Sequence, residues 1–205
     1  QEHGLKIIHI STDYVFDGTK NTPYTEEDIP NPLNVYGRTK LAGEQAIQAV
    51  DGNYLIFRTS WVYGTRGKNF YLTILKLAQE QEEIRVVDDQ IGAPTWCRMI
   101  AESTSLILSQ GINQPEGFNS HFEERKGIYH MTAGGQTSWY GFAKCIIDKI
   151  PLERKKVRCI VPIETKDYLY QAERPLNSVM SNAKLSEKFI LTLSNWVEQL
   201  YLVIN

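Results

Sequence analysis

Tyr36 and Lys40 lie four residues apart in the stretch NVYGRTKLAGEQ (residues 34–45), and together they could transfer a proton. A free tyrosine has a pKa of about 10 and is a poor proton donor or acceptor at neutral pH. An ammonium group one helical turn away stabilises the phenolate, and an i, i+4 spacing holds both groups on one face of a helix. A tyrosine tuned in this way can exchange a proton with a carbinol or carbonyl group.

Thr12 carries a hydroxyl that could polarise the same oxygen atom, as the donors of an oxyanion hole do. It lies in the stretch STDYVFDG (residues 11–18), directly after a strand-like run. Thr, Tyr and Lys form a set for carbonyl reduction, and a nicotinamide is implied because side chains cannot supply a hydride. The alternative is that Ser, Thr and Asp at this place only cap turns.

A second Tyr-x-x-x-Lys match, Tyr140 and Lys144, shows that spacing alone does not identify a catalytic pair. The first pair opens a helix that follows a strand and a polar loop. The second pair lies on a late amphipathic helix in which Trp139, Phe142, Ala143 and Ile146 are predicted to be core residues. We therefore interpret Tyr140 as structural and Tyr36 as the catalytic candidate.

These side chains must be positioned by an alternation of strands and helices. Apolar, β-branched runs that predict strands occupy residues 5–10, 54–59, 84–87, 127–133 and 157–163. Helical spacing occupies residues 35–51, with Asn34 as the N-cap, and 69–83, 97–109 and 138–150, and two more helices begin near Asn182 and Ser194. The alternation predicts an α/β fold with a parallel sheet, in which the first run is a buried strand with neighbours on both sides. The polar residues 110–126 predict a surface loop.

In an open parallel sheet, ligands bind beyond the carboxyl ends of the strands. The stretches that follow the first two strands, residues 11–18 and 59–64, carry hydroxyls, an acid and aromatic rings. Such residues suit a small polar substrate with a ring face to cover. We therefore expect the chemistry at this edge of the sheet.

Composition excludes several other classes of function. A net charge of −2 gives no basic field for a nucleic acid polymer or an anionic membrane. No apolar run approaches the ~20 residues needed to span a bilayer. Cys97, Cys145 and Cys159 are odd in number, scattered and without C-x-x-C spacing, which argues against a disulfide framework or a zinc site. We expect a cytoplasmic protein.

Two other groups of polar residues receive structural interpretations. Asp88 and Asp89 are adjacent, so they point to opposite faces of a strand and do not form a glycosidase pair; a turn or the rim of the substrate site suits them better. His9 and His130 lie in predicted strands without a nucleophile motif or metal spacing. We interpret both as core or rim residues.

Several linked stretches carry a resemblance to a known family. They include STDYVFDG, NVYGRTKLAGEQ, FRTSWVYG, DDQIGAPT, YHMTAGG and ERPLNS. In this order they resemble the dTDP-4-dehydrorhamnose reductases, the RmlD-like extended short-chain dehydrogenases/reductases. The similarity runs through the whole chain and is far more specific than any one Tyr-x-x-x-Lys match.

The resemblance implies a reaction and a set of site residues. The enzymes reduce the C4 keto group of dTDP-4-dehydrorhamnose with NADPH or NADH to give dTDP-L-rhamnose. Thr12, Tyr36 and Lys40 match the catalytic triad, in which Tyr36 would protonate the C4 alkoxide and Lys40 would hold the nicotinamide ribose. Mg²⁺ is a candidate metal and a homodimer a candidate assembly. Residues that would contact the dTDP-sugar are Asp13, Trp61, Arg174 and Asn177.

The implied architecture is the C-terminal part of a Rossmann-type domain, interleaved with a smaller substrate-binding domain. Residues 1–60 and 95–133 would form the cofactor-binding half and residues 61–94 and 134–205 mainly the substrate domain. The chain departs from the family because it has no Gly-rich turn at its start to hold a pyrophosphate. We therefore expect a fragment that is inactive in isolation, in preference to a chain whose missing part another chain supplies, and NADPH and NADH are both candidate cofactors.

Two alternatives share parts of this pattern. A sugar-nucleotide epimerase or dehydratase of the same fold would use the same Tyr and Lys. A non-catalytic regulatory subunit, similar to the β subunit of methionine adenosyltransferase, would keep stretches like DYVFDG. Trp61 within RTSW and the stretch DDQIGAPT favour the reductase.

Overall fold

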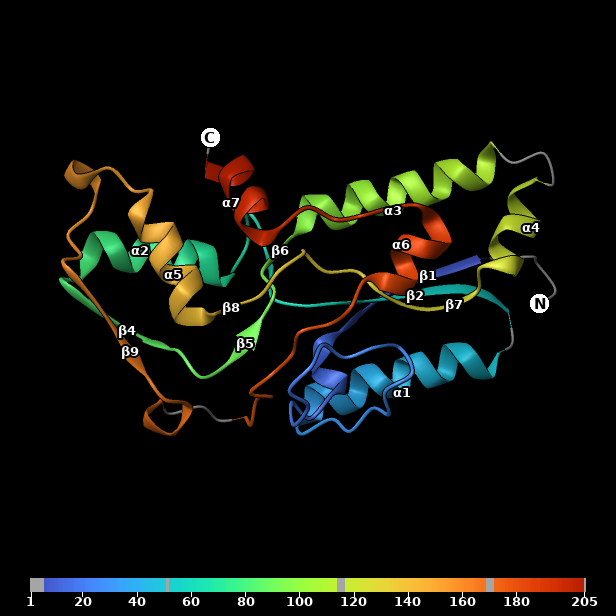
Figure 1. Cartoon of the computed structure of the whole chain (residues 1–205), viewed down its shortest axis with the longest axis horizontal. Coiled ribbons are helices and arrows are strands. Elements are labelled where there is room, and N and C mark those ends of the chain that lie inside the picture. The colour runs from blue at the N-terminus through green and yellow to red at the C-terminus, as the bar shows by residue number, and fades with distance from the viewer. Residues whose placement is uncertain (1–5, 51, 114–116, 169–171, 205) are drawn as a thin grey trace.

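The computed structural model describes residues 6–50, 52–113, 117–168 and 172–204 (Figure 1). The strands are β1 (Lys6–Thr12), β2 (Asn53–Thr59), β3 (Val62–Tyr63), β4 (Glu83–Val87), β5 (Ile91–Gly92), β6 (Thr95–Trp96), β7 (Gly127–His130), β8 (Thr137–Ser138) and β9 (Cys159–Ile163). The helices are α1 (Val35–Ala49), α2 (Phe70–Glu80), α3 (Cys97–Ile112), α4 (Gly117–Glu124), α5 (Trp139–Asp148), α6 (Ala183–Phe189) and α7 (Trp196–Ile204), with short 3-10 helices η1 (Asp13–Val15), η2 (Leu152–Arg154) and η3 (Thr165–Asp167).

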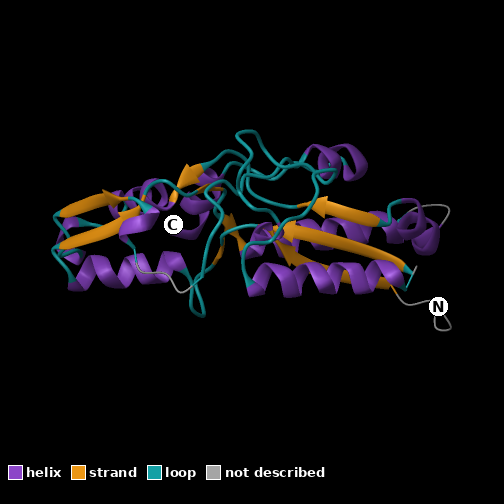
Figure 2. Cartoon of the chain, turned by 90° about the horizontal axis from the view of Figure 1, so that it is seen from below, coloured by secondary structure: helices purple, strands orange, loops and turns teal. Residues whose placement is uncertain are grey.

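A parallel three-stranded sheet of order β1-β2-β7 forms one end of the molecule (Figure 2). Its central strand β2 is the most apolar, with Leu55, Ile56 and Phe57 fully buried. The predicted α/β fold with a parallel sheet is confirmed. The first strand differs from the expectation of two neighbours: within the described residues β1 pairs only with β2, and Ile7 and Ile10 are 39% and 40% exposed.

Helices cover both faces of this sheet. Successive side chains of β2 point to opposite faces, so each face makes its own contacts with the helices. Leu55 and Phe57 face α3, α4 and α6, with which they form one apolar cluster. Arg58 points to the opposite face and meets α1. The cluster consists of Leu55, Phe57, Ile100, Ile107, Phe122, Tyr129, Met131, Leu185, Phe189 and Leu193.

The prediction of a surface loop over residues 110–126 was wrong. Helix α3 continues to Ile112, and α4 forms within the supposed loop. The helix is polar apart from two aromatic residues one turn apart, Phe118 and Phe122, whose ring centroids lie 4.8 Å apart. Phe122 is 1% exposed and joins the sheet cluster. Tertiary burial of this short apolar stripe stabilises a helix that the polar composition concealed.

The other end of the molecule is a second layer built on the parallel pair β4–β9. Helices α2 and α5 lie against this pair (Figure 1), and their apolar faces meet Ile84 and Val86 of β4. Phe142 of α5 is fully buried between Tyr63, Phe70 and Trp196. Phe142, Ala143 and Ile146 of this helix are buried as predicted, whereas Trp139 is only partly buried.

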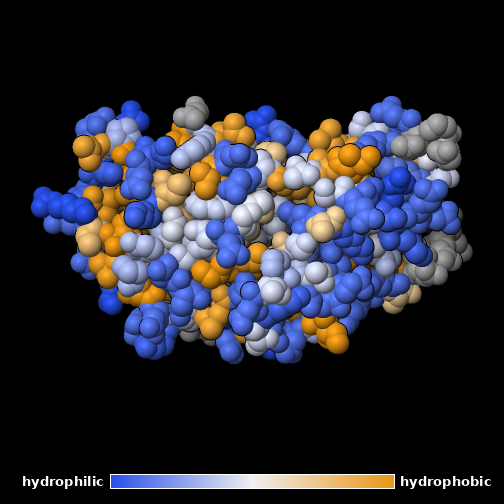
Figure 3. All heavy atoms as spheres, in the orientation of Figure 1, coloured by the Kyte–Doolittle hydropathy of each residue, from blue (hydrophilic) through white to orange (hydrophobic). Residues whose placement is uncertain are grey.

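The segment between the two ends carries the pairs β3–β6 and β5–β8. In Figure 3, hydrophilic and hydrophobic residues are interspersed over the visible face of the molecule. Among the described residues, every helix is too short or too polar to cross a membrane.

Candidate active site

Thr12 and Thr59 are register partners at the carboxyl ends of β1 and β2. Thr12 is 5% exposed and is the N-cap of η1, because its Oγ1 accepts a hydrogen bond of 3.2 Å from the backbone N–H of Tyr14. Its hydroxyl also donates to Asp13 Oδ1 at 3.0 Å. The turn-capping role foreseen as the alternative for Thr12 is thus present, at the edge where a parallel sheet binds ligands.

Tyr36 lies in the first turn of α1, which begins where the sequence predicted. Asn34 is the N-cap, and its Oδ1 accepts from the N–H of Gly37 at 2.8 Å. The Asn34 amide also donates to the Glu173 carbonyl at 2.8 Å, which ties this end of α1 to the stretch ERPLNS. Tyr36 is 53% exposed, and its ring packs edge-on against Tyr14 at 5.8 Å. Its phenol is therefore accessible beside η1.

Lys40 follows one turn later and reaches the last part of β1. Its Nζ donates a hydrogen bond of 2.6 Å to the carbonyl of Ile10, two residues before Thr12. An ammonium has three donors, so this bond fixes the direction of the side chain without using all of them. The structure therefore brings Thr12, Tyr36 and Lys40 to the same end of the sheet.

Asp13 is a buried carboxyl group directly beside Thr12. Burial raises the pKa of Asp13 to about 6 from an ordinary 3.8, against the opposing effect of hydrogen bonds from Ser178 and Thr12. Asp13 is 2% exposed. A carboxyl group with this pKa changes its charge close to neutral pH.

A buried ion pair that sequence reasoning missed anchors α1 behind this site. Arg58 Nη2 donates to Glu44 Oε2 at 2.6 Å and Arg58 Nε to Oε1 at 3.0 Å, and the Ser11 hydroxyl donates to the same carboxylate. Glu44 lies four residues after Lys40 and eight after Tyr36, so all three share one face of α1. The i, i+4 spacing of Glu44 from Lys40 could have revealed this ion pair in the sequence, because an acid on the inner face of a helix needs a buried partner.

Trp61 follows β2 in a strained conformation. Its φ is 47°, in the left-handed region that large side chains avoid. Its indole stacks on that of Trp139, the first residue of α5, with ring centroids 3.5 Å apart and planes 5° from parallel. Trp61 therefore connects the carboxyl end of the three-stranded sheet with the α2–β4–α5 layer.

Arg174 is half-buried and, with Trp139, lines a cavity of about 210 Å³. Residues of α2 and β4 form most of the wall, including Phe70, Ile74 and Arg85. The lining combines apolar side chains with two arginines, Arg85 and Arg174. Such a lining suits a planar base linked to a diphosphate.

Asn177 holds two loops together by its side-chain amide. Its Nδ2 donates to the Lys20 carbonyl at 2.6 Å, and its Oδ1 accepts from the N–H of Val179 at 3.1 Å. It also bridges to Ile91 of β5. The structure thus shows Asn177 between loop 17–24 and β5, where it shapes the surroundings of the site.

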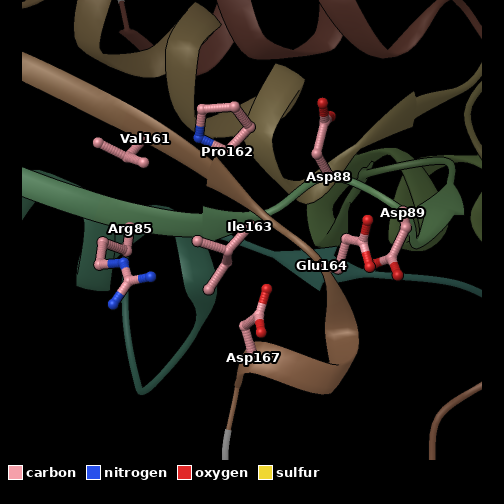
Figure 4. A pocket seen from close by; sticks show the side chains of 8 residues that line it. All are labelled: Arg85, Asp88, Asp89, Val161, Pro162, Ile163, Glu164 and Asp167. Carbon is pink, nitrogen blue, oxygen red and sulfur yellow. The ribbon is translucent and has the colours of Figure 1, made fainter.

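Asp88 and Asp89 point to different partners, as the interpretation of a turn requires. Asp88 accepts from the Ser138 hydroxyl at 2.5 Å, whereas Asp89 accepts from the N–H and hydroxyl of Thr165. Both line an open hollow of about 500 Å³ together with Glu164 and Asp167, and Figure 4 shows Asp89 beside Glu164 and Asp88 pointing away from them. Among the described residues, no group of three or more His, Cys, Asp or Glu side chains could hold a metal ion. The described residues therefore offer no cluster of such ligands for the expected Mg²⁺ ion.

His130 is a core residue, as predicted. It has no exposed surface. Burial lowers its pKa to about 3 from 6.5, and the nearby positive charge of Arg58 adds to the shift. A histidine that stays neutral at physiological pH and lies inside the sheet does not serve as a proton carrier for this site.

The chain matches known proteins along its whole length. A family model described as the RmlD substrate binding domain matches residues 1–205. The dTDP-4-dehydrorhamnose reductase of Burkholderia thailandensis is 48% identical over an alignment of 202 positions that covers 94% of this chain and 65% of that protein. The reductase of Escherichia coli K12 is 42% identical over 95% of this chain and 63% of its own length. The chain therefore spans a little under two thirds of the curated relatives it matches.

Solved structures agree in fold. A dTDP-4-dehydrorhamnose reductase from Bacillus anthracis, in complex with NADP, has a TM-score of 0.84 and 35% identity over 99% of this chain and 66% of that one. An orthologue from Clostridium acetobutylicum has a TM-score of 0.83 and 36% identity over 97% of this chain and 65% of that one. A dTDP-glucose 4,6-dehydratase from Streptomyces venezuelae has a TM-score of 0.69 at 15% identity, which shows a shared fold alone.

Proposed function

The chain belongs to the RmlD substrate binding domain family, and from this premise we propose that its protein reduces the C4 keto group of dTDP-4-dehydrorhamnose with NADPH or NADH. The product would be dTDP-L-rhamnose. The observation that carries the proposal is the convergence of Thr12, Tyr36 and Lys40 on the carboxyl ends of two parallel strands. The names of the relatives at 42% and 48% identity support the reaction.

Each residue of the set has a role that its surroundings support. The exposed phenol of Tyr36 donates a proton to the C4 oxygen as negative charge develops there. Lys40, held by the Ile10 carbonyl, carries a positive charge one turn along the same helix and stabilises the phenolate that is left. The Thr12 hydroxyl donates to the substrate oxygen in place of Asp13.

The residues present fit the nicotinamide end of a dinucleotide. Tyr36 is exposed and Lys40 has free donors at the edge of a parallel sheet where dinucleotides bind. When bound, the cofactor supplies the hydride. Tyr36 and Lys40 would hold its ribose through the phenol and the ammonium. The NADP in the B. anthracis relative supports a nicotinamide cofactor and leaves NADH as the second candidate.

The dTDP-sugar would lie between the strand ends and the cavity beside Trp139. Trp61 would cover the sugar ring, with Asp13 beside the reacting carbon and Asn177 supporting the loop that closes on it. Arg174 would pair with the diphosphate at the rim of the cavity.

We also propose the interleaved domain division, in which residues 1–60 and 95–133 bind the cofactor and residues 61–94 and 134–205 mainly bind the substrate. Separate apolar clusters at the two ends support it. Residues 185–193 pack with the cofactor-binding part, so the division is not strict. A cytoplasmic location and a homodimer stay predictions from the sequence.

The reaction is tested on a polypeptide of the relatives' length that contains these 205 residues. dTDP-4-dehydrorhamnose is mixed with NADPH or with NADH, and cofactor oxidation is followed together with the mass of the sugar product. Oxidation with formation of dTDP-rhamnose is expected. Absence of turnover with both cofactors, in a folded protein that binds dTDP, would overturn the proposal.

A further inference from the structure

We propose that Trp139 is a positioning residue that fixes the direction of the Trp61 indole beside the sugar site. Trp139 itself lies in α5, outside the Thr12, Tyr36 and Lys40 set. The inference rests on the proposed function for its effect on the substrate, whereas the contact between the two indoles stands independently of it.

The backbone of Trp61 needs support from its surroundings. A left-handed φ of 47° in a non-glycine residue is strained and persists only when neighbouring contacts fix it. Two hydrogen bonds hold this turn: the backbone N–H of Thr95 donates to the Trp61 carbonyl at 3.3 Å, and the side-chain hydroxyl of the preceding Ser60 donates to the Ala93 carbonyl at 2.8 Å. These bonds fix the turn but leave the direction of the indole undetermined.

The indole direction is set by Trp139. Free aromatic pairs prefer offset or edge-to-face arrangements with centroids about 4.5–7 Å apart. The Trp61–Trp139 rings overlap almost fully at 3.5 Å and 5°, so their surroundings must impose this geometry. On the Trp61 side, Gly92 leaves the necessary space, because a Cβ atom there would lie 2.5 Å from Trp61 Cε2.

Trp139 is in turn held by Gln90 and Phe70. Its Nε1 donates to Gln90 Oε1 at 3.2 Å, and its ring packs on Phe70 with centroids 4.5 Å apart. Gln90 is 2% exposed and is itself held, because its Nε2 donates to Thr165 Oγ1 at 3.1 Å. Trp139 therefore has little freedom to leave the stack.

The stretch DDQIG explains how one segment arranges both indoles. Every second residue of this stretch contacts the stack or the helix that carries it. Asp88 accepts from Ser138, the N-cap of α5, Gln90 binds the indole of Trp139, and Gly92 accommodates Trp61. The same stretch that distinguished this sequence from related families thus forms the support of the stack. The stacked indoles of Trp61 and Trp139 therefore form a fixed aromatic wall between the strand ends and the cavity lined by Arg174.

The test uses Trp139→Ala, Trp139→Phe and Trp96→Phe in the full-length protein. Trp96 is a matched control because its ring lies over Arg98, outside the stack. Stacked indoles give an exciton couplet in the far-ultraviolet circular dichroism spectrum, which reports the contact without any activity. We expect Trp139→Ala to lose the couplet and to raise the KM for the dTDP-sugar about tenfold, which corresponds to the ~1.4 kcal/mol of a strong aromatic contact. The kcat should stay within about threefold, since the proton donor is untouched.

Trp139→Phe keeps a flat ring and should restore most of the KM, and Trp96→Phe should keep both the couplet and the KM. If Trp139→Ala fails to fold, Gly92→Ala provides the second variant, because it displaces Trp61 and leaves Trp139 intact; it should lose the couplet and raise the KM in the same way. An unchanged KM in a variant that has lost the couplet would overturn the inference. If the unsubstituted protein binds dTDP but reduces no sugar, the proposed function fails; the dissociation constant of a dTDP-sugar, measured in the same variants, then replaces the KM.

Discussion

Glu44 and Arg58 form a two-pronged ion pair inside the protein, with side chains that are 1% and 2% exposed. The pair joins α1 to β2, and the Ser11 hydroxyl adds a contact from β1. The Arg58 guanidinium also lies over the ring of Phe16, with a centroid distance of 5.2 Å. Since Lys40 precedes Glu44 by one helical turn, this ion pair fixes the helix that carries the candidate proton donor.

Removing one partner of this pair should destabilise the protein strongly. In Glu44→Gln or Arg58→Met, an uncompensated buried charge or polar group is left, and we expect the free energy of unfolding to fall by about 3–5 kcal/mol. Denaturant titration measures the loss. Arg98→Ala is the matched control, since it removes an exposed i, i+4 pair with Glu102 and should change stability by less than about 0.5 kcal/mol. Equal effects of the two changes would contradict the prediction.

Tyr36→Phe should lower turnover by about 10²–10⁴-fold, the usual contribution of a general acid. The ring and its contact with Tyr14 remain, and Tyr36 is 53% exposed, so stability and dTDP-sugar binding should hardly change. Steady-state kinetics and calorimetric titration measure the two quantities. Tyr140→Phe, in the second Tyr-x-x-x-Lys pair, should retain turnover. A parallel loss of binding in Tyr36→Phe would refute the role of proton donor.

Asp13 should make the protein less stable as the pH rises through its native pKa. Burial raises the pKa of Asp13 to about 6, whereas the unfolded value is 3.8. The native state therefore holds a proton that the unfolded state has lost, so the contribution is complete below the unfolded pKa and disappears above about pH 6. Relative to wild type, Asp13→Asn should gain about 2 kcal/mol between roughly pH 4 and pH 7. Urea titrations at both pH values test this, and a constant difference would contradict it.

His130 should produce the opposite pH dependence. Burial lowers the pKa of His130 to about 3 from 6.5, so the unfolded state binds a proton that the native state refuses. This lowers stability as the pH falls below about 6.5 and has no effect above it. In His130→Gln the loss of stability between roughly pH 7 and pH 4 should be smaller than in wild type. If the two proteins lose stability equally over that range, His130 is not the group responsible.

The sequence predicted features that depend on local pattern. Strand runs, the N-cap Asn34 and the divergence of Asp88 from Asp89 are each determined by a few neighbouring residues. The position of Thr12 at a strand end followed from the same local reading.

Features that depend on tertiary contacts were missed. Glu44 and Arg58 lie on different elements, and the stack of Trp61 on Trp139 joins residues far apart in the chain. The helix α4 forms because Phe122 is buried against the sheet, which its polar sequence did not reveal. These contacts become visible only when the elements are placed in space.

Gly37 and Gly43 lie in the same helix α1, yet they should respond in opposite ways to alanine. A Cβ atom at Gly37 would lie 2.1 Å from the Tyr14 carbonyl oxygen, so the helix can approach η1 this closely only with glycine. A Cβ atom at Gly43 has nothing nearer than His9 Nε2 at 3.9 Å. Gly43→Ala should therefore stabilise the protein by about 0.5–1 kcal/mol, the usual gain of alanine over glycine inside a helix.

Gly37→Ala should have the reverse effect, with a cost of about 1–3 kcal/mol for the forced separation of α1 from η1. Because Tyr36 directly precedes Gly37, the same shift moves the phenol away from Thr12. Turnover in Gly37→Ala should consequently fall even without denaturant and at a temperature at which the protein is fully folded. Gly43→Ala should keep its turnover under the same conditions. Thermal melts and kinetics on the two variants together test the close approach. A stable and fully active Gly37→Ala protein would show that α1 does not need this contact to present Tyr36.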